Sequence, residues 1–397
     1  MKVLYITTSF FRNESASIRN ISLVNGLIAN EVEIDVLTLN YTENVEDIFL
    51  KNSLNKKIKI IKVDIKRYNK ISSKLKFLKK NSKNSKSSKN YILKIKNIFQ
   101  NILFFPDALC ESIKNSDNVK FEKNYNYIIS SSDSKTSHFI AERVIKKNNF
   151  NNIPWIQIWG DPWADDTGLN QLNFLLKKRV ENNEKRLLKK ADKIFYLSDI
   201  TAKRTKNKYP YLKEKIYILY RSYLKEIISK NDVENMICSY TGTIKNRNIL
   251  PILNSIKIYN ETFQKKIVLN FYGIESRVDV DFSNYDFINI YPRVSFEKVL
   301  DIYSNSDILL YIDNLHNSSQ IPGKIYDYFG TNKAILALVE GRETKEFLEK
   351  FKRADIYENR EEKINLSEVI DKIDSYEVKE EFSPKNIARK FIEDIKK

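Results

Sequence analysis

Short apolar runs rich in β-branched residues alternate along the chain with longer segments whose apolar residues recur at three- or four-residue steps. The short runs are typical of buried strands, and the longer spacing is typical of helices with one buried face. Regular alternation of the two favours βαβ units and a parallel sheet. In the first half it predicts helices around 18–28, 139–144 and 172–180, and strands at 3–6, 32–38, 58–63, 127–130, 155–158, 194–197 and 216–219.

The same alternation resumes after a charged stretch, residues 225–234, that has little apolar periodicity. It predicts helices around 250–256 and 296–303, and strands at 237–241, 267–272, 288–291, 308–312 and 334–338. A chain of 397 residues also exceeds the size that one core supports well. We therefore predict an α/β protein with two doubly wound, Rossmann-like domains, 1–225 and 226–382. A C-terminal helix, 383–397, is expected to pack back on the first domain, with Pro384 in its first turn.

Composition excludes several classes of protein. Cys110 and Cys238 lie far apart, which excludes a disulfide framework or a structural zinc site and fits a reducing compartment. His138 and His316 are the only two histidines, so a His-based metal site is not expected. The first apolar run is broken at Thr7 and reads as a strand, and no run of about 18 apolar residues suggests a membrane span. We expect a cytoplasmic, soluble or peripheral protein.

The formal net charge is +17, an excess that attracts polyanions. Twelve Lys and Arg residues and no acidic residue lie in the stretch 66–101, and outside it the signs are better mixed. This stretch interrupts the first domain and ends in an amphipathic pattern. One interpretation is a solvated loop. The other is a segment that rests on an anionic membrane surface, where each basic side chain contributes about 1 kcal/mol.

Residues 322–336 read PGKIYDYFGTNKAIL. They resemble the "P-x-K-x-x-E-Y" block of GT-B glycosyltransferases, in particular the family-4-like retaining enzymes of bacterial polysaccharide assembly. The resemblance runs over nearly the whole chain and implies that two domains face each other across a cleft, with the acceptor domain first and the donor domain second. In the family the acid of this block binds hydroxyls of the donor; the matching residue here is Asp327, followed by Tyr328. Lys324, one turn earlier, would stabilise the charge that grows on the departing diphosphate.

This block departs from the family pattern at one position. Many relatives carry a Glu eight residues before the acid, and here that place is taken by Ser319. Ser319 and its neighbour Gln320 can supply only neutral hydrogen bonds to a donor.

Residues 240–248, YTGTIKNRN, are similar to the strand-to-helix turn of the donor domain. Gly242 would allow close approach of the diphosphate. Thr243 stands where many relatives have Arg, and Arg247 matches the second cation of the family. Arg293 is a further donor-side candidate, since 291–295 resemble the turn before a helix that faces the nucleotide. Gly273 is also taken as a donor-side candidate.

Residues 153–163, IPWIQIWGDPW, are similar to the acceptor-side strand and turn of the family. Asp161 follows the carboxyl end of a predicted strand, where α/β enzymes place functional groups. It would orient the acceptor or the reacting centre. The run at 130–133 and the pair at 137–138 resemble a Ser-rich turn and a helix start. Acceptor-side candidates are therefore Ser9, Arg19, Ser132 and His138.

The resemblance implies a hexosyltransferase-type enzyme (EC 2.4) of capsule, O-antigen or exopolysaccharide biosynthesis. Its catalytic candidates are Asp161, Lys324 and Arg247. The transfer would retain configuration and need no metal or cofactor besides the nucleotide-diphosphate sugar, and the acceptor would be a glycan or a lipid-linked precursor at the inner face of the plasma membrane. Two alternatives stay open. One is a GT-B-like sugar-nucleotide epimerase, which would change the donor alone; the other is a non-enzymatic, basic membrane- or RNA-binding protein.

Overall fold

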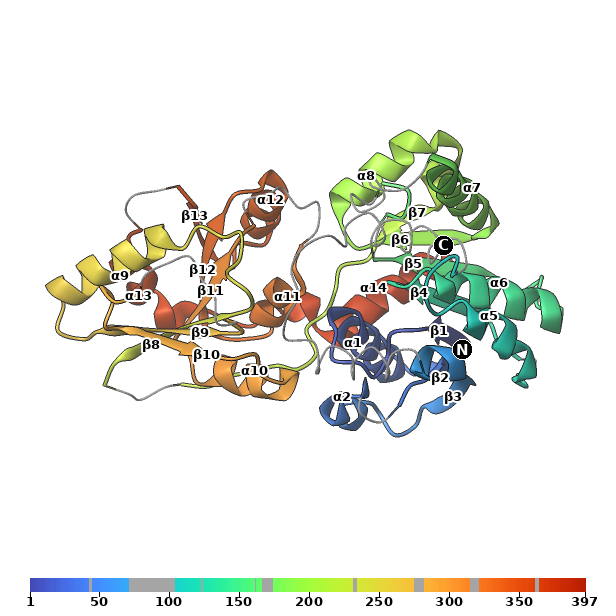
Figure 1. The fold of residues 1–397 in the computed structure, drawn as a ribbon, viewed down its shortest axis with the longest axis horizontal. Coiled ribbons are helices and arrows are strands. Elements are labelled where there is room, and N and C mark those ends of the chain that lie inside the picture. The colour runs from blue at the N-terminus through green and yellow to red at the C-terminus, as the bar shows by residue number, and fades with distance from the viewer. Residues whose placement is uncertain are drawn as a thin grey trace, which may run out of the picture. The chain divides into compact units, whose positions relative to one another are not determined.

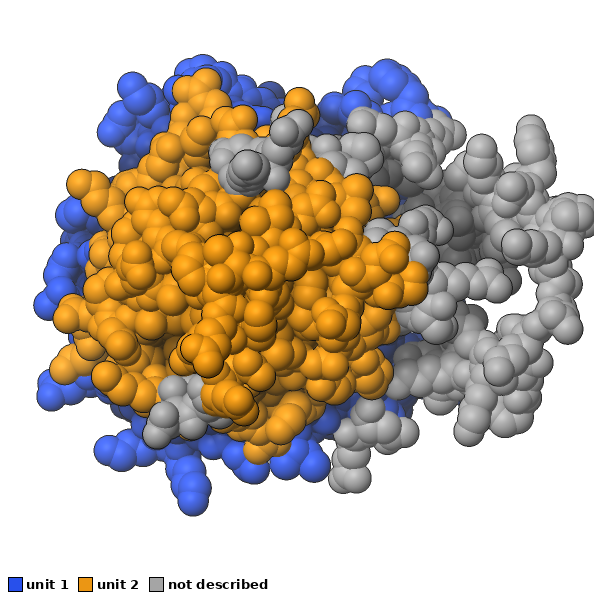
Figure 2. Space-filling model, turned by 90° about the vertical axis from the view of Figure 1, so that its left-hand side faces the viewer, with its two compact units in different colours: residues 1–220, 388–397 blue, residues 221–387 orange. Residues whose placement is uncertain are grey.

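The computed structural model describes residues 1–42, 45–70, 104–122, 124–160, 162–165, 174–230, 234–274, 282–314, 321–360 and 364–397 (Figure 1). The chain divides into two compact units (Figure 2). Unit 1 comprises Met1–Tyr220 together with Ala388–Lys397, and unit 2 comprises Arg221–Ile387. The part of the basic stretch from residue 71 to 101 lies outside the described residues, as do Asp161, Ser319 and Gln320.

Unit 1 is built on a seven-stranded sheet with the order β3-β2-β1-β4-β5-β6-β7. Every paired neighbour is parallel. The strands are β1 (Lys2–Thr7), β2 (Glu33–Asn40), β3 (Lys59–Asp64), β4 (Tyr127–Ser132), β5 (Trp155–Trp159), β6 (Lys193–Tyr196) and β7 (Ile216–Ile218). The helices are α1 (Ser15–Ala29), α2 (Ile48–Asn52), α5 (Glu111–Asn115), α6 (Thr136–Asn148), α7 (Phe174–Lys190), α8 (Asp199–Lys208) and α14 (Pro384–Lys396).

Helices lie against both faces of this sheet (Figure 1), so its central strands are buried on both sides. All six residues of β1 are buried, and so are all five of β5. From Ala388 onward α14 belongs to unit 1, where the Phe391 ring packs against Phe195 with centroids 4.7 Å apart. The C-terminal end of the chain is therefore part of the core of unit 1, most of which is formed by the first half of the chain.

Unit 2 repeats the design with a six-stranded sheet in the order β10-β9-β8-β11-β12-β13, again parallel throughout. Its strands are β8 (Met236–Thr241), β9 (Ile267–Tyr272), β10 (Ile288–Tyr291), β11 (Ile308–Ile312), β12 (Ala334–Val339) and β13 (Asp355–Glu358). Its helices are α9 (Leu250–Thr262), α10 (Phe296–Ser304), α11 (Gly323–Phe329), α12 (Arg342–Phe351) and α13 (Leu366–Asp371). Phe329 of α11, Phe347 of α12 and Phe382 pack against one another.

The predicted fold class is confirmed: both halves are doubly wound parallel α/β units. All twelve predicted strands are present with ends within two residues, and β13 was missed. β13 has only four residues, of which the first and last are acidic, and it lies at a sheet edge, so it lacks the apolar run of a central strand. Within the described residues, no helix is both long and apolar enough to cross a membrane.

The strand orders locate the place where each unit can bind a ligand. In unit 1 the order reverses between β1 and β4, and in unit 2 between β8 and β11. Loops that leave the carboxyl ends of such strand pairs diverge, and ligands of open α/β sheets bind beside them.

Candidate functional site

The turn after β8 is the first element of the candidate site in unit 2. Gly242 has a φ of +135° and Gly273, in the turn after β9, has a φ of +100°, both of which favour glycine. The Gly242 amide donates to the Tyr272 carbonyl at 2.8 Å, and the Gly273 amide donates to the Tyr291 carbonyl at 3.0 Å. A Cβ on Gly273 would lie 3.3 Å from the Gly242 carbonyl oxygen. The two turns therefore pack closely against each other. Because both carry glycine, main-chain atoms rather than side chains lie at this end of the sheet.

Lys324, the second residue of α11, reaches under the Gly242 turn. Its Nζ donates to the Thr241 carbonyl at 2.5 Å and lies 4.3 Å from the centroid of the Tyr240 ring. A Cβ added to Gly242 would lie only 3.0 Å from this nitrogen. The amine is thus held between the end of β8 and the face of the Tyr240 ring, two contacts that favour its charged form, whereas burial opposes it.

Arg247 is hydrogen-bonded to the same turn. Its Nε donates to the Thr243 carbonyl at 2.8 Å, and its Nη1 donates to the carbonyl of Ile312, the last residue of β11. The guanidinium carbon lies 5.9 Å from the centroid of the Tyr240 ring. Arg247 therefore joins the two strand ends at the switch point and brings a second cation to the tyrosine that Lys324 contacts.

The electrostatics of this pair favour an anion. Burial and, as a smaller cause, the nearby charge of Arg247 together lower the pKa of Lys324 to about 7. Within the described part of the chain, neither side chain forms an ion pair with a carboxylate. A bound anion would bring negative charge to this pair and favour the charged form of Lys324.

Asp327 lies one helical turn after Lys324, but its neighbours differ. Burial raises the pKa of its carboxyl group to about 7, and the charge of Arg221 opposes this shift only in part. No ion pair between Lys324 and Asp327 is present, so their three-residue spacing does not produce a surface salt bridge here. Asp327 is half-buried, and near neutral pH it can donate or accept a hydrogen bond.

The other described donor-side candidates occupy different positions. Thr243 is exposed on the turn after β8, and Arg293 is exposed on the turn after β10. Tyr328 is fully buried, and its hydroxyl donates to the Leu310 carbonyl at 3.1 Å. Its side chain therefore supports the sheet rather than facing an open site.

An aromatic pair at the ends of β9 and β10 was missed by the sequence analysis. The rings of Tyr272 and Tyr291 stack with centroids 4.6 Å apart and an interplanar angle of 12°. Tyr291 is 39% exposed, next to the Gly273 turn. Tyr291 begins the 291–295 turn that resembles a nucleotide-facing turn, but its pairing with Tyr272 depends on the parallel register of β9 and β10 and was not predicted.

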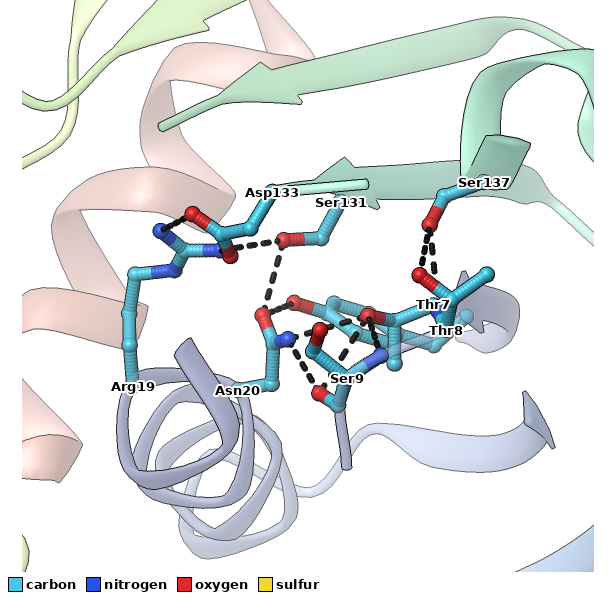
Figure 3. Close-up of polar contacts among 9 residues, drawn as sticks. Thr7, Thr8, Ser9, Arg19, Asn20, Ser131, Asp133 and Ser137 are labelled. Carbon is cyan, nitrogen blue, oxygen red and sulfur yellow. Dashed lines mark hydrogen bonds and ion pairs between the residues drawn. The ribbon is translucent and has the colours of Figure 1, made fainter. Parts of the chain in front are cut away.

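Unit 1 holds a polar cluster at the carboxyl ends of β1 and β4 (Figure 3). The Nη2 of Arg19, on α1, lies 2.6 Å from Oδ2 of Asp133 and donates to the Ser131 hydroxyl at 3.2 Å. The Arg19 side chain is only 6% exposed, whereas that of Asp133 is 31% exposed. The ion pair thus has its cation inside the unit and its carboxylate at the surface.

Asn20 connects the cluster to the first strand. Its amide nitrogen donates to the Thr7 hydroxyl at 3.0 Å and to the Ser9 carbonyl at 2.7 Å (Figure 3). Its amide oxygen accepts from the Ser131 and Tyr5 hydroxyls at 2.7 and 2.9 Å. Such a satisfied buried network fixes the loops that carry it. Asn20 was not predicted, and Asp133 was recognised only as the last residue of the run at 130–133, not as a site candidate.

The remaining acceptor-side candidates are buried. The Ser132 hydroxyl has no hydrogen-bond partner among the described residues. Nδ1 of His138 lies 2.7 Å from the Ser130 hydroxyl, and its ring packs on Trp159 with centroids 4.4 Å apart. Burial holds the pKa of His138 well below 6.5, so the imidazole is neutral at physiological pH.

The described residues on either side of Asp161 are anchored to neighbouring elements. The Gly160 amide donates to the Ser132 carbonyl at 3.1 Å, and a Cβ at Gly160 would clash with Oδ1 of Asp133. On the other side of Asp161, Oε2 of buried Glu184 accepts from the amides of Trp163 and Ala164 at 2.9 and 2.7 Å. Among described residues, no group of three or more His, Cys, Asp and Glu side chains could hold a metal ion.

Comparison with known proteins gives agreement in structure and none in sequence. No family model matches the chain, and no curated protein is similar to it in sequence. The structure is similar to a UDP-N-acetylglucosamine 2-epimerase, with a TM-score of 0.57 and 11% identity over 100% of this chain and 95% of that one. A glycosyltransferase from Rickettsia africae has a TM-score of 0.53 and 13% identity over 100% and 97% of the two chains.

A mutant of TarM from S. aureus, crystallised with UDP, fondaparinux and α-GlcNAc-glycerol, has a TM-score of 0.54 and 11% identity over 99% and 96% of the two chains. Identities this low show the fold alone. Taken with the two parallel sheets and their strand orders, they show that this chain has the GT-B fold of two Rossmann-like domains.

Proposed function

We propose that this protein is a glycosyltransferase that moves a sugar from a nucleotide-diphosphate donor to a glycan or lipid-linked acceptor. The observation that carries the proposal is the pair Lys324 and Arg247. Both cations contact the Tyr240 ring beside the Gly242 turn, and neither has a carboxylate partner among the described residues. Two such cations beside the partly exposed Gly242 turn suit a diphosphate better than a neutral ligand.

In the proposed reaction, the bond between the sugar and the diphosphate breaks while negative charge grows on the departing phosphate. Lys324 and Arg247 would stabilise this charge, and Asp327 would bind a hydroxyl group of the donor. The exposed face of Tyr291 and the Arg293 side chain lie at the ends of the neighbouring strands and could take the base. The departing phosphate would accept the proton of the attacking hydroxyl, which is the retaining route that we propose.

The acceptor would bind at unit 1, beside Asp133 and the loop that carries Asp161. The buried network around Arg19 and Asn20 would hold that surface in place. We assign the pathway to capsule, O-antigen or exopolysaccharide biosynthesis in the cytoplasm at the inner face of the plasma membrane, with no metal or further cofactor. No role in nucleic-acid binding is proposed.

A sugar-nucleotide epimerase is the second candidate, because one structural neighbour with the same fold bears that name. The two candidates differ in what they need. An epimerase changes the sugar nucleotide with no acceptor present, whereas a transferase gives a new glycan only when an acceptor is added.

A thermal-shift panel of sugar nucleotides tests the donor site directly. A ligand at 100 times its Kd should raise the free energy of unfolding by about 2.7 kcal/mol. Product analysis with the best donor, alone and with lipid-linked or oligosaccharide acceptors, then separates transfer from epimerisation. If no nucleotide stabilises the protein, or if Lys324→Ala binds the best donor as tightly as the wild type does, the proposal is wrong.

A further inference from the structure

A second concentration of positive charge lies in a part of the chain that is fully described. Residues 174–215 contain fourteen Lys and Arg residues against five Asp and Glu residues. They form α7, β6, α8 and the short helix η4 (Pro210–Lys215). The view that signs are well mixed outside 66–101 is therefore incomplete, because this segment of unit 1 carries an excess of nine positive charges.

None of the exposed residues of α7 is acidic, and Glu181, which neighbours Lys178 and Lys185 at helical spacing, is half-buried. Leu176, Val180 and Leu187 are buried against unit 1. On the opposite side, exposed residues follow one another at steps of four, four, three and four, which places them on one stripe of an α-helix. They are Phe174, Lys178, Asn182, Lys185 and Lys189.

Apolar and aromatic side chains lie at both ends of this stripe. Phe174 and Leu175, at the start of α7, are 74% and 71% exposed. At the other end, Nζ of Lys189 lies 5.4 Å from the centroid of the Tyr211 ring, which is 55% exposed. Large exposed apolar side chains beside lysines are typical of segments that rest at a lipid–water interface.

The stripe is held rigidly, and its lysines are available. Glu184 ties α7 to the end of α8, because its Oε1 accepts from the Tyr209 hydroxyl at 3.2 Å and lies 3.6 Å from Nζ of Lys208. Two other cations of α7, Arg186 and Lys190, pair with Glu142 on α6. Lys178 and Lys185, in contrast, form no ion pair with the described residues.

We propose that this α7 face, defined as Phe174, Leu175, Lys178, Lys185 and Lys189 with Tyr211, docks on an anionic lipid bilayer. The lysines attract the headgroups, and Phe174, Leu175 and Tyr211 enter the interface. The stripe is about 22 Å long, because it spans 15 residue steps with a rise of 1.5 Å each. This length matches an extended surface better than a small ligand. RNA is the alternative partner: Phe174 and Tyr211 could stack on bases, but Leu175 offers no ring, whereas all three apolar side chains can enter a lipid interface. The inference does not depend on the proposed transfer reaction.

Sedimentation of the full chain with vesicles tests this surface. The vesicles contain phosphatidylcholine alone or phosphatidylcholine with phosphatidylglycerol. The double variant Lys178→Glu/Lys185→Glu should bind the anionic vesicles at least about tenfold more weakly than the wild type. The control Lys257→Glu/Lys265→Glu changes net charge equally at exposed lysines of unit 2 and should bind as the wild type does.

A second double variant, Phe174→Ser/Leu175→Ser, separates a bilayer from a nucleic acid. It should also bind the anionic vesicles more weakly, with an unchanged melting temperature, because it removes the side chains that enter the interface. Equal binding by the α7 charge variant and its control would overturn the proposal. So would a wild type that binds both vesicle types alike, or vesicle binding that survives Phe174→Ser/Leu175→Ser while polyuridylate competes it away.

Discussion

The Nζ of Lys324 lies 2.5 Å from the carbonyl oxygen of Thr241, which is 83 residues earlier in the chain. This contact joins the start of α11 to the end of β8, directly beneath the Gly242 turn. A lysine amine that is enclosed in this way, next to Arg247, has a pKa lowered to about 7 and is therefore poised between its neutral and charged forms. The candidate donor site is thus sensitive to charge brought by a ligand.

Removing the Lys324 amine should reduce catalysis more than folding. We expect Lys324→Ala to lower kcat/KM for transfer by about 10²- to 10³-fold, the scale seen when a charge-stabilising donor is removed from an active site. Steady-state kinetics with the best donor of the thermal-shift panel measure it. Lys257→Ala, at an exposed lysine of α9, serves as the control. Unchanged kinetics in Lys324→Ala would remove this residue from the mechanism.

Binding of a nucleoside diphosphate should be coupled to proton uptake. The free protein loses the Lys324 proton as pH rises through about 7, whereas the bound diphosphate favours the charged amine and raises its pKa. Affinity should therefore fall by up to about tenfold per pH unit above pH ~7.5. Calorimetry in buffers of different ionisation enthalpy measures the proton uptake. Lys324→Ala should abolish the pH dependence, and a wild-type affinity that is constant over this range would contradict the coupling.

Gly242→Ala tests the turn itself. Alanine is strained at a φ of +135°, and its Cβ would lie 3.0 Å from Nζ of Lys324. We expect a loss of about 1 to 3 kcal/mol in the free energy of unfolding, and weaker diphosphate binding because the amine must move. Denaturant unfolding and nucleotide titration report the two effects separately. A variant that matches the wild type in both would show that the turn tolerates a side chain and contributes no binding backbone.

Asp133→Asn tests the ion pair in unit 1. It leaves the Arg19 guanidinium inside the unit without its carboxylate, which should destabilise the protein by about 2 kcal/mol, a value reduced because Asp133 is partly exposed. The double variant Arg19→Met/Asp133→Asn removes both charges and should lose less stability than the sum of the two single variants. Chemical denaturation of all four proteins gives the coupling energy, and strict additivity would contradict a direct interaction.

Asp327→Asn should change how stability depends on pH. Because the folded-state pKa is raised from 3.8 to about 7, the folded protein binds more protons than the unfolded chain between about pH 4 and 7. Wild-type stability should therefore fall across this window as pH rises, relative to the variant. Near pH ~8 we expect Asp327→Asn to be more stable by about 2 kcal/mol, discounted from the full shift because the carboxyl is partly exposed. Melting curves of the two proteins measure this difference in stability. The same difference at both ends of the pH window would contradict the prediction.

Local patterns in the sequence were enough to predict the fold class. The predicted strands at 267–272 and 308–312 are present as β9 and β11 with the predicted ends. They were predictable because a strand that is buried on both faces has a continuous run of apolar residues. The same rule failed at β13, where edge residues alternate less and carry charge. The motif around Gly242 was also readable, since a turn that requires positive φ leaves a glycine in the sequence.

Only the tertiary structure decided which of these residues meet. Arg19 and Asp133 are 114 residues apart, and they pair because β1 and β4 are neighbours in the sheet. The stacking of Tyr272 on Tyr291 depends on the register of β9 and β10, and the buried state of His138 depends on its packing against Trp159. The spacing of apolar residues in the sequence shows which side chains face a core. Strand order and register, in contrast, are set by packing between distant segments. The periodicity was therefore visible in advance, and the partners of each polar group were not.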